Sequence, residues 1–182
     1  MKIAICSDLH LEFAPVTIDN TEEATVLILS GDILVERDLD IYDRRQDEMG
    51  FMRGTSARYH EFFKDVCSKF PYVLYVAGNH EHYHGDFKYT TSELKNKLAH
   101  YNNLYILDKE VKHIDDVAFV GGTLWTDMNK EDPMTLHMIS KMMNDFRCVD
   151  NSNREVNFKT FDDEGKPTFR TRCARFSPED AV

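Results

Sequence analysis

The stretch Pro71-Tyr-Val-Leu-Tyr-Val-Ala-Gly-Asn-His-Glu81 places an apolar run directly before a cluster of polar residues. The run from Pro71 to Ala77 is almost continuously apolar, as is typical of strands that are buried on both faces of a parallel sheet. Ile3 to Ser7 and Ala24 to Ser30 have the same character, and both also end in polar or glycine residues. The sequence therefore predicts three parallel strands.

The segments around these strands predict helices and further strands. Ser56 to Phe70 carries aromatic and aliphatic residues at helical spacing and would connect two of the parallel strands as a β-α-β unit. The other predicted elements are a helix over Thr91 to His100, strands over Leu104 to Leu107 and Val117 to Gly121 around the turn Asp115-Asp116, a helix with a methionine-rich, core-filling face over Pro133 to Met143, and a hairpin of Val156 to Phe161 and Thr168 to Phe176. The charged segment Glu36 to Arg53 is expected to be a mobile, acidic insertion.

Length and composition indicate one globular domain over residues 1–182. Hydrophobic residues make up 42% and charged residues 30% of the 182 residues, which is ordinary for a folded protein. The net charge of −10 disfavours binding to bulk nucleic acid but suits a carboxylate cluster that holds divalent cations. The four cysteines have no paired spacing, and the sequence shows neither a signal peptide nor a run of about 20 apolar residues. We therefore expect a cytoplasmic protein that does not enter a membrane.

The last residues, Ser177 to Val182, have the pattern of a helix N-terminus, but no further helical residues follow. Ser177 is a preferred N-cap residue, Pro178 suits the first helical position, and acidic residues follow in the first turn. This pattern predicts a chain truncated at its C-terminus, and the alternative is a frayed tail.

Polar residues of metal-binding type follow each of the three parallel strands. They are Asp8 and His10 after the first strand, Asp32 after the second and Asn79 after the third. Because the carboxyl ends of parallel strands lie at one edge of a sheet, these side chains should converge. Asp8 and His10 would point the same way from an extended chain, while Leu9 points away from them.

Each of these positions suits a different part of phosphoester chemistry. Asp32 could bridge two metal ions, and Gly31 before it permits a sharp turn. Asn79 offers a neutral oxygen ligand, while His80 could hydrogen-bond a phosphate or protonate a leaving oxygen. Glu81 would orient a ligand or a backbone amide from behind.

The ordered motifs Asp-x-His, Gly-Asp and Gly-Asn-His-Glu together resemble the N-terminal half of the calcineurin-like metallophosphoesterase superfamily. The stretches Gly122 to Asp127 and Met143 to Phe146 further resemble small bacterial and phage members. The resemblance implies an α/β fold of packed β-sheets flanked by helices. It also implies a hydrolase that cleaves phosphomonoesters or phosphodiesters through a metal-bridging hydroxide. The implied cofactors are two divalent ions, manganese foremost, with iron, zinc, nickel or magnesium as alternatives.

The same resemblance assigns a role to each site residue. It implies that Asp8 and His10 hold the first metal, Asp32 bridges, Asn79 holds the second metal, and His80 is the catalytic histidine. Asn79 and His80 would also contact the substrate.

The sequence departs from the family pattern after Glu81. No Gly-His-x-His motif follows, so the first metal has three protein ligands and the second only two, and the C-terminal strands of the fold are expected to be missing. No role is carried over to the remaining histidines, which are His82, His84, His100, His113 and His137. The alternative function is therefore a truncated or split family member that acts by association, or is inactive alone, with a homo-oligomer or a missing C-terminal segment as partner. An exposed apolar sheet face would indicate it.

Several residues also have simpler explanations. Asp8, Asp32 and Asn79 could cap helices or form turns, and His82 could extend the cluster or lie in a solvated loop. His60 is expected on the surface, and Trp125 and Cys6 in the core. Arg170, Arg172 and Arg175 could contact phosphate or form an exposed strand face. A nuclease that acts on an oligonucleotide or nucleotide is a third possible function.

Overall fold

The computed structural model describes residues 1–50 and 54–181. Strands and helices alternate in its first part, and a long hairpin dominates the last part. The elements are β1 (Ile3–Cys6), β2 (Val26–Ser30), α1 (Arg44–Glu48), α2 (Gly54–Lys69), β3 (Tyr72–Val76), α3 (Thr90–Lys97), β4 (Leu104–Ile106), β5 (Glu110–Ile114), β6 (Val117–Gly121), α4 (Met128–Glu131), α5 (Pro133–Met142), α6 (Asp145–Cys148), β7 (Asp150–Phe161) and β8 (Pro167–Arg175), with short 3₁₀ helices at Glu36–Asp38, His80–His82 and Pro178–Asp180.

Backbone contacts divide the chain into two compact units. Unit 1 comprises Met1–Tyr83 and Thr90–Leu124, and unit 2 comprises His84–Tyr89 and the residues from Trp125 onward. The single domain expected from the sequence stays a prediction.

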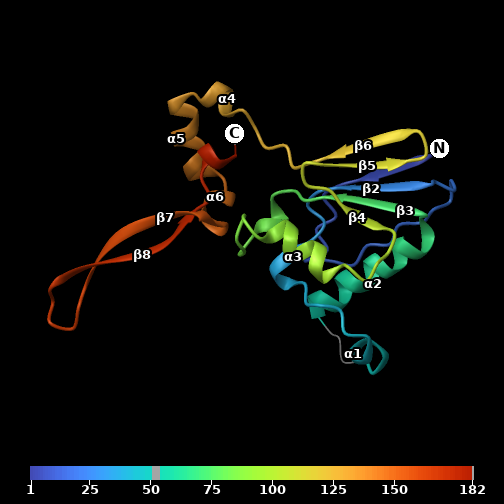
Figure 1. The fold of residues 1–182 in the computed structure, drawn as a ribbon, viewed down its shortest axis with the longest axis horizontal. Helices are drawn as coiled ribbons and strands as arrows, with labels where there is room; N and C mark the ends of the chain where they lie inside the picture. Colours follow the sequence, from blue (N-terminus) through green and yellow to red (C-terminus); the bar gives the residue numbers. More distant parts are fainter. Residues whose placement is uncertain (51–53, 182) are drawn as a thin grey trace. The chain divides into compact units, whose positions relative to one another are not determined.

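The centre of unit 1 is a parallel sheet in the order β1-β2-β3-β4. The three predicted parallel strands are thus confirmed, and β4 extends the sheet as a fourth. One face of the sheet packs against α2 and α3, which supply Phe63, Val66 and Leu94 to the main core. Figure 1 shows α2 beneath the sheet, as expected for a β-α-β crossover.

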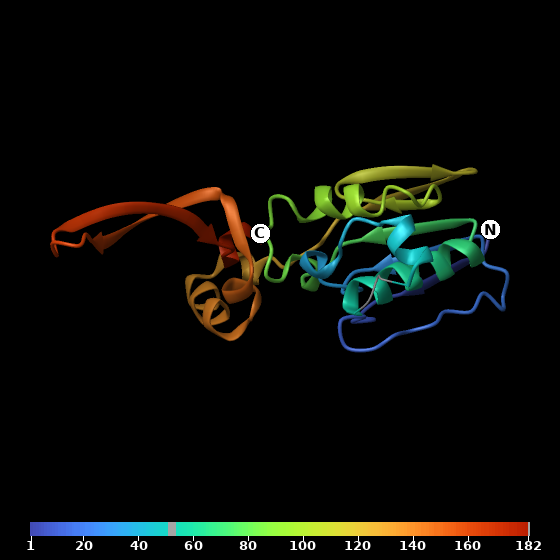
Figure 2. The same cartoon turned by 90° about the horizontal axis from the view of Figure 1, so that it is seen from below.

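The opposite face of this sheet is covered by the β5-β6 hairpin. Ile114 from β5 and Phe119 from β6 pack with Val26, Ile28 and Leu74. Both Figure 1 and Figure 2 show the hairpin and α2 on opposite sides of the sheet. The result is a mixed α/β architecture with a parallel sheet flanked by helices, in agreement with the predicted fold class.

The β5 strand was not predicted from the sequence. Leu104 to Leu107 and Val117 to Gly121 contain strands as expected, but these belong to different sheets, and the turn at Asp115-Asp116 joins β5 to β6. The sequence of β5, Glu-Val-Lys-His-Ile, has no apolar pattern that would predict a strand, because only Ile114 is buried.

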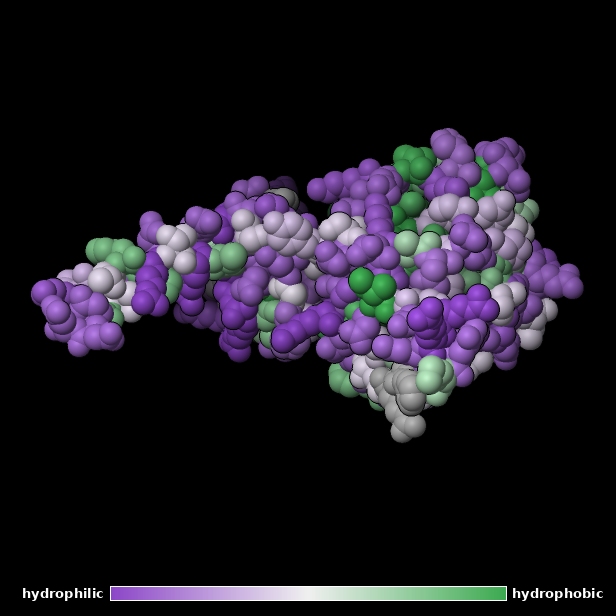
Figure 3. Space-filling model, turned by 60° about the horizontal axis from the view of Figure 1, so that its bottom comes forward, coloured by the Kyte–Doolittle hydropathy of each residue, from purple (hydrophilic) through white to green (hydrophobic). Residues whose placement is uncertain are grey.

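The β5-β6 hairpin leaves part of unit 1's apolar surface uncovered. On the edge strand β1, Ile3 and Ile5 are 45% and 68% exposed, whereas Ala4 and Cys6 between them pack against the main core. On the face drawn in Figure 3, apolar residues form separate patches within a mostly hydrophilic surface.

The charged insertion has more buried structure than its composition suggests. Leu39 is fully buried, and the carboxylate of Glu36 lies 2.5 Å from Nζ of Lys97. The prediction that His60 lies on the surface is wrong. His60 is buried: its ring lies beside the stacked rings of Tyr42 and His100, with centroids 5.4 and 5.6 Å away, and its Nε2 lies 2.9 Å from the carbonyl oxygen of Asp40. Residues 51–53 of the insertion lie outside the described residues.

Unit 2 contains a small aromatic cluster and the β7-β8 hairpin, which confirms the predicted hairpin and extends its first strand back to Asp150. Trp125 and Phe176 have ring centroids 4.8 Å apart, and Phe87 and Phe146 also contact Phe176. The expected core-filling role of the methionine-rich helix is wrong, because α5 has no buried residue. No helix in the described ranges combines the length and the apolar composition that crossing a membrane requires.

Candidate metal centre

The loops that follow β1 and β2 run side by side beyond the ends of the strands. The backbone amides of Asp8, His10 and Leu11 donate to the carbonyls of Gly31, Asp32 and Ile33 at 3.0, 3.0 and 2.9 Å. These bonds continue the pairing of the two strands into the loops. They hold Asp8 and His10 against the segment that carries Asp32, so the predicted convergence has a backbone cause.

Two glycines allow the loops after β2 and β3 to approach each other. Gly31 has a φ of +88°, and a Cβ at this position would lie 2.8 Å from Cα of Gly78. A Cβ at Gly78 would lie only 2.2 Å from Oδ1 of Asp32. Both distances are too short for non-bonded heavy atoms, so each of these positions requires glycine.

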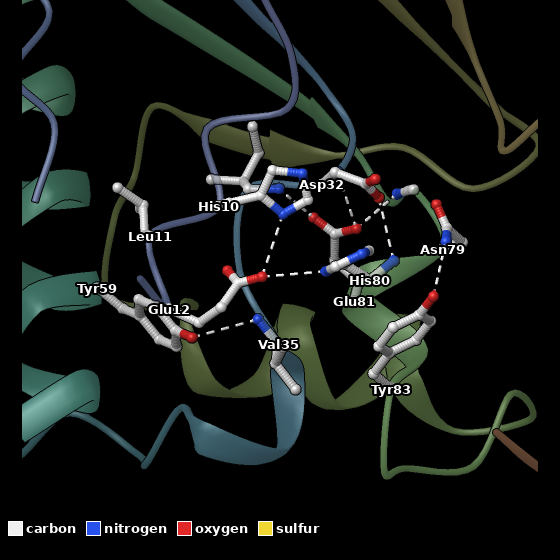
Figure 4. Close-up of polar contacts among 12 residues, drawn as sticks. His10, Leu11, Glu12, Asp32, Val35, Tyr59, Asn79, His80, Glu81 and Tyr83 are labelled. Atoms are coloured by element: carbon white, nitrogen blue, oxygen red, sulfur yellow. Dashed lines mark hydrogen bonds and ion pairs between the residues drawn. The ribbon is translucent and has the colours of Figure 1, made fainter. Parts of the chain in front are cut away.

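His10, Asp32 and His80 form a group that could hold a metal ion, with ligand atoms all within 4.8 Å of one another. Oδ1 of Asp32 accepts a hydrogen bond from the backbone amide of His80 at 3.0 Å, which connects the two loops directly (Figure 4). Within the described ranges, Asp32 forms no ion pair with a lysine or arginine. Two imidazoles and an uncompensated carboxylate are a donor set that suits divalent zinc, manganese, iron or nickel.

Asp8 lies outside this group of histidine and carboxylate ligands, and Asn79 carries an amide oxygen, a ligand of a different type. Asp8 is exposed. Nδ2 of Asn79 donates to the hydroxyl of Tyr83 at 3.3 Å, and the amide oxygen points to the other side (Figure 4). The structure thus brings His10 and Asp32 together with His80, while Asp8, held by its backbone amide, is exposed and outside the group.

The backbone at the predicted ligands is not extended, as the sequence argument assumed. Asp8, His10 and Asp32 have φ values of 56°, 47° and 55°, all in the left-handed region. This region is unfavourable for most residues, and aspartate and histidine are among those that tolerate it best. Residues in such conformations concentrate at functional sites, where the surrounding fold holds them in place.

Glu81 supports the site from below, in agreement with its predicted role. Its fully buried carboxylate accepts hydrogen bonds from the amides of Asp32, Ile33 and Gly78 and, at 2.6 Å, from the hydroxyl of Tyr75. Burial raises the pKa of Glu81, and these hydrogen bonds oppose that shift. Glu81 therefore ties the loops after β2 and β3 to the core of the sheet.

Glu12 is a site residue that the sequence analysis missed. Its Oε1 lies 3.1 Å from Nδ1 of His10 and 3.0 Å from Nδ1 of His80. Figure 4 shows this carboxylate between the two rings. The available signal was its position, because Glu12 continues the alternation of Asp8 and His10 at every second residue.

His82 does not belong to the metal-binding group. It is buried, so the solvated-loop explanation is wrong, and burial lowers its pKa to about 4. The lowered pKa keeps this buried imidazole neutral at neutral pH.

The converging loops bring side chains that could hold a metal ion together at the carboxyl edge of a parallel sheet in an α/β fold. Calcineurin-like phosphoesterase is the family that matches the sequence, over residues 1–171, and the chain belongs to this family. The chain is also 28% identical over 166 residues to an uncharacterised protein of Acanthamoeba polyphaga mimivirus. This match covers 88% of the chain but only 56% of that relative's length. No solved structure matches the chain.

Proposed function

We propose that this chain hydrolyses a phosphomonoester or phosphodiester with the help of divalent cations. The observation that carries this proposal is the convergence of His10, Asp32 and His80 at the carboxyl edge of a parallel sheet. Family membership supports the same reaction class. The four cysteines are free, which supports a reducing, cytoplasmic setting.

The residues of this cluster and its neighbours would have different roles in the reaction. His10 and Asp32, together with Asp8 and Asn79, would hold two cations, with manganese as the preferred ion. These cations would neutralise charge on the phosphoryl oxygens and activate water. His80, fixed through its backbone amide, would hydrogen-bond the phosphate or donate a proton to the leaving oxygen.

Asp32→Asn tests this function with little disturbance of the fold. Asparagine tolerates the left-handed backbone at this position, and its amide oxygen can still accept from the amide of His80. We expect the variant to lose Mn²⁺ binding in titration calorimetry and hydrolysis of a nitrophenyl phosphate ester. Asp163→Asn, at an exposed position in the β7-β8 turn, is the matched control. Full activity of Asp32→Asn would contradict the proposal.

A second candidate function is association through the uncovered edge of unit 1. The exposed Ile3 and Ile5 on β1 favour it, because an edge strand with apolar side chains offers both backbone and side-chain contacts to another strand. The partner would be a second copy of this chain. Sedimentation velocity should then show concentration-dependent association that Ile5→Lys abolishes and that Phe169→Lys, on the hairpin of unit 2, retains. A wild-type protein that is monomeric at all concentrations would contradict this candidate.

A further inference from the structure

We propose that Glu12 is a positioning residue that fixes the tautomers of His10 and His80. In this arrangement, both imidazoles carry their proton on Nδ1 and donate it to Oε1 of Glu12, so both present an unprotonated Nε2. Only the use of these Nε2 atoms rests on the proposed function: His10 would give its Nε2 lone pair to a cation, and His80 would take up a proton on Nε2 and pass it to the leaving oxygen.

The contact distances support shared acceptance by one carboxylate oxygen. At 3.1 and 3.0 Å, both Nδ1 atoms are at hydrogen-bond distance from the same oxygen. An ionised carboxylate can only accept, so each imidazole has to donate from the nitrogen that faces it. The two rings lie edge to face, with centroids 4.4 Å apart.

The surroundings of Glu12 argue against a purely structural role. Among the described residues, its only ion-pair partners are His10 and His80, and its Oε2 is buried without a hydrogen-bond partner. The guanidinium of Arg58 donates instead to the carbonyl of Leu11 at 2.7 Å. A carboxylate placed only for stability would have both oxygens satisfied. In Glu12, only Oε1 has partners, and these are the two imidazole rings of His10 and His80.

The backbones of both histidines are already fixed by other contacts. The amide of His10 donates to the carbonyl of Asp32, and the amide of His80 donates to the carboxylate of the same residue. The ring of His80 also stacks on Tyr83 with centroids 4.3 Å apart. What these contacts leave open is the choice of ring nitrogen that carries the proton, and Glu12 determines it. Partners of this kind orient metal-binding histidines and raise their basicity.

The test is nitrogen-15 NMR of the histidine rings in metal-free protein, which distinguishes a protonated from an unprotonated nitrogen in each ring. His10→Gln and His80→Gln assign the two signals. Wild type should show both rings with the proton on Nδ1, whereas Glu12→Gln and Glu12→Ala should show a mixture that includes the Nε2-protonated form. Glu12→Gln keeps the volume of the side chain, so it remains informative if Glu12→Ala fails to fold.

Mn²⁺ titration provides a second, independent measurement. Glu12→Gln should weaken Mn²⁺ binding by about 10–100-fold, the range found when such partners of metal-binding histidines are changed. Glu22→Gln removes the same charge from an exposed position in the same long loop and should leave the affinity unchanged.

The outcomes separate this inference from the proposed function. Unchanged ring tautomers in both Glu12 variants would overturn the inference even if their stability fell, as would an Mn²⁺ affinity equal to that of Glu22→Gln. If the proposed function alone is wrong, Asp32→Asn retains hydrolysis while the ring signals still depend on Glu12.

Discussion

The parallel sheet of unit 1 and the β7-β8 hairpin of unit 2 differ in how far they bury phenylalanine side chains. Phe63, on the helix that covers the sheet, is fully buried, whereas Phe169 on the hairpin is 75% exposed. Parallel strands need crossover helices, and these helices bury apolar side chains. A two-stranded antiparallel hairpin can leave its faces to water. The comparison shows that burial in this protein follows from connectivity as well as from side-chain character.

Carboxylates differ between the two regions in the same way. Glu81 is buried in unit 1 and accepts four hydrogen bonds, three of them from backbone amides. Glu164, in the turn of the hairpin, is exposed and pairs with Lys166 at 2.7 Å. A buried carboxylate requires such partners, whereas an exposed pair contributes little. In this comparison, the carboxylate that ties parts of the fold together is Glu81, beneath the candidate metal centre.

The largest expected difference between the regions is in packing. Phe63→Ala should lower the free energy of unfolding by about 3–5 kcal/mol, because it leaves a cavity beside Phe62, Tyr75 and Tyr101. Phe169→Ala removes the same atoms from an exposed site and should change it by less than about 0.5 kcal/mol. Urea denaturation of both variants measures the difference. Equal losses would mean that the hairpin is covered in solution.

A smaller difference should appear in the pH dependence of stability. The pKa of His82 is lowered from 6.5 to about 4 by burial, so the unfolded chain binds the proton more tightly than the folded chain. The free energy of unfolding is therefore highest above about pH 6.5. It falls by about 3 kcal/mol in all as the pH drops towards 4.

Removal of that histidine tests the assignment. His82→Gln should flatten the pH dependence between these values, measured as the midpoint of urea unfolding at each pH. His137→Gln, at an exposed position on α5 of unit 2, should leave it as in wild type. A slope that His82→Gln does not alter would assign the acid sensitivity to other groups.

The smallest effect concerns one hydroxyl group. The hydroxyl of Tyr59 accepts from the backbone amide of Val35 at 3.3 Å inside the core. Tyr59→Phe leaves that amide without an acceptor and should cost about 1 kcal/mol in thermal or urea unfolding. Tyr89→Phe, on a half-exposed ring of unit 2, should cost less. A larger loss for Tyr89→Phe would contradict the contrast between the two regions.

The sequence predicted the parallel strands because they are continuous apolar runs, and α2 because its aromatic residues recur at helical spacing. It did not predict β5, because a strand that buries only Ile114 carries almost no apolar pattern. His60 was misplaced for a related reason. Its neighbours in sequence are charged, and the rings that bury it, Tyr42 and His100, come from distant segments.

At the site, the order of motifs predicted which strand ends converge and placed Glu81 behind them. The reason given for pairing Asp8 with His10 was incorrect, because these residues are left-handed rather than extended. The role of Glu12 at the site could not be predicted from the residues around it in sequence. One of its two histidine partners, His80, lies 68 positions away in the chain. Long-range pairs of side chains are visible only once the fold has brought them together.

The contact between Gly31 and Gly78 has a consequence for the precision of the site. Where two loops touch through backbone atoms, their separation is set by bonded geometry and atomic radii rather than by side-chain rotamers. Asp32 and Asn79 each follow one of these glycines directly. The spacing of the candidate ligands is therefore set by the backbone contact between the two loops. A single added methyl group at either glycine would act as a spacer, moving one loop as a whole while leaving every ligand chemically intact.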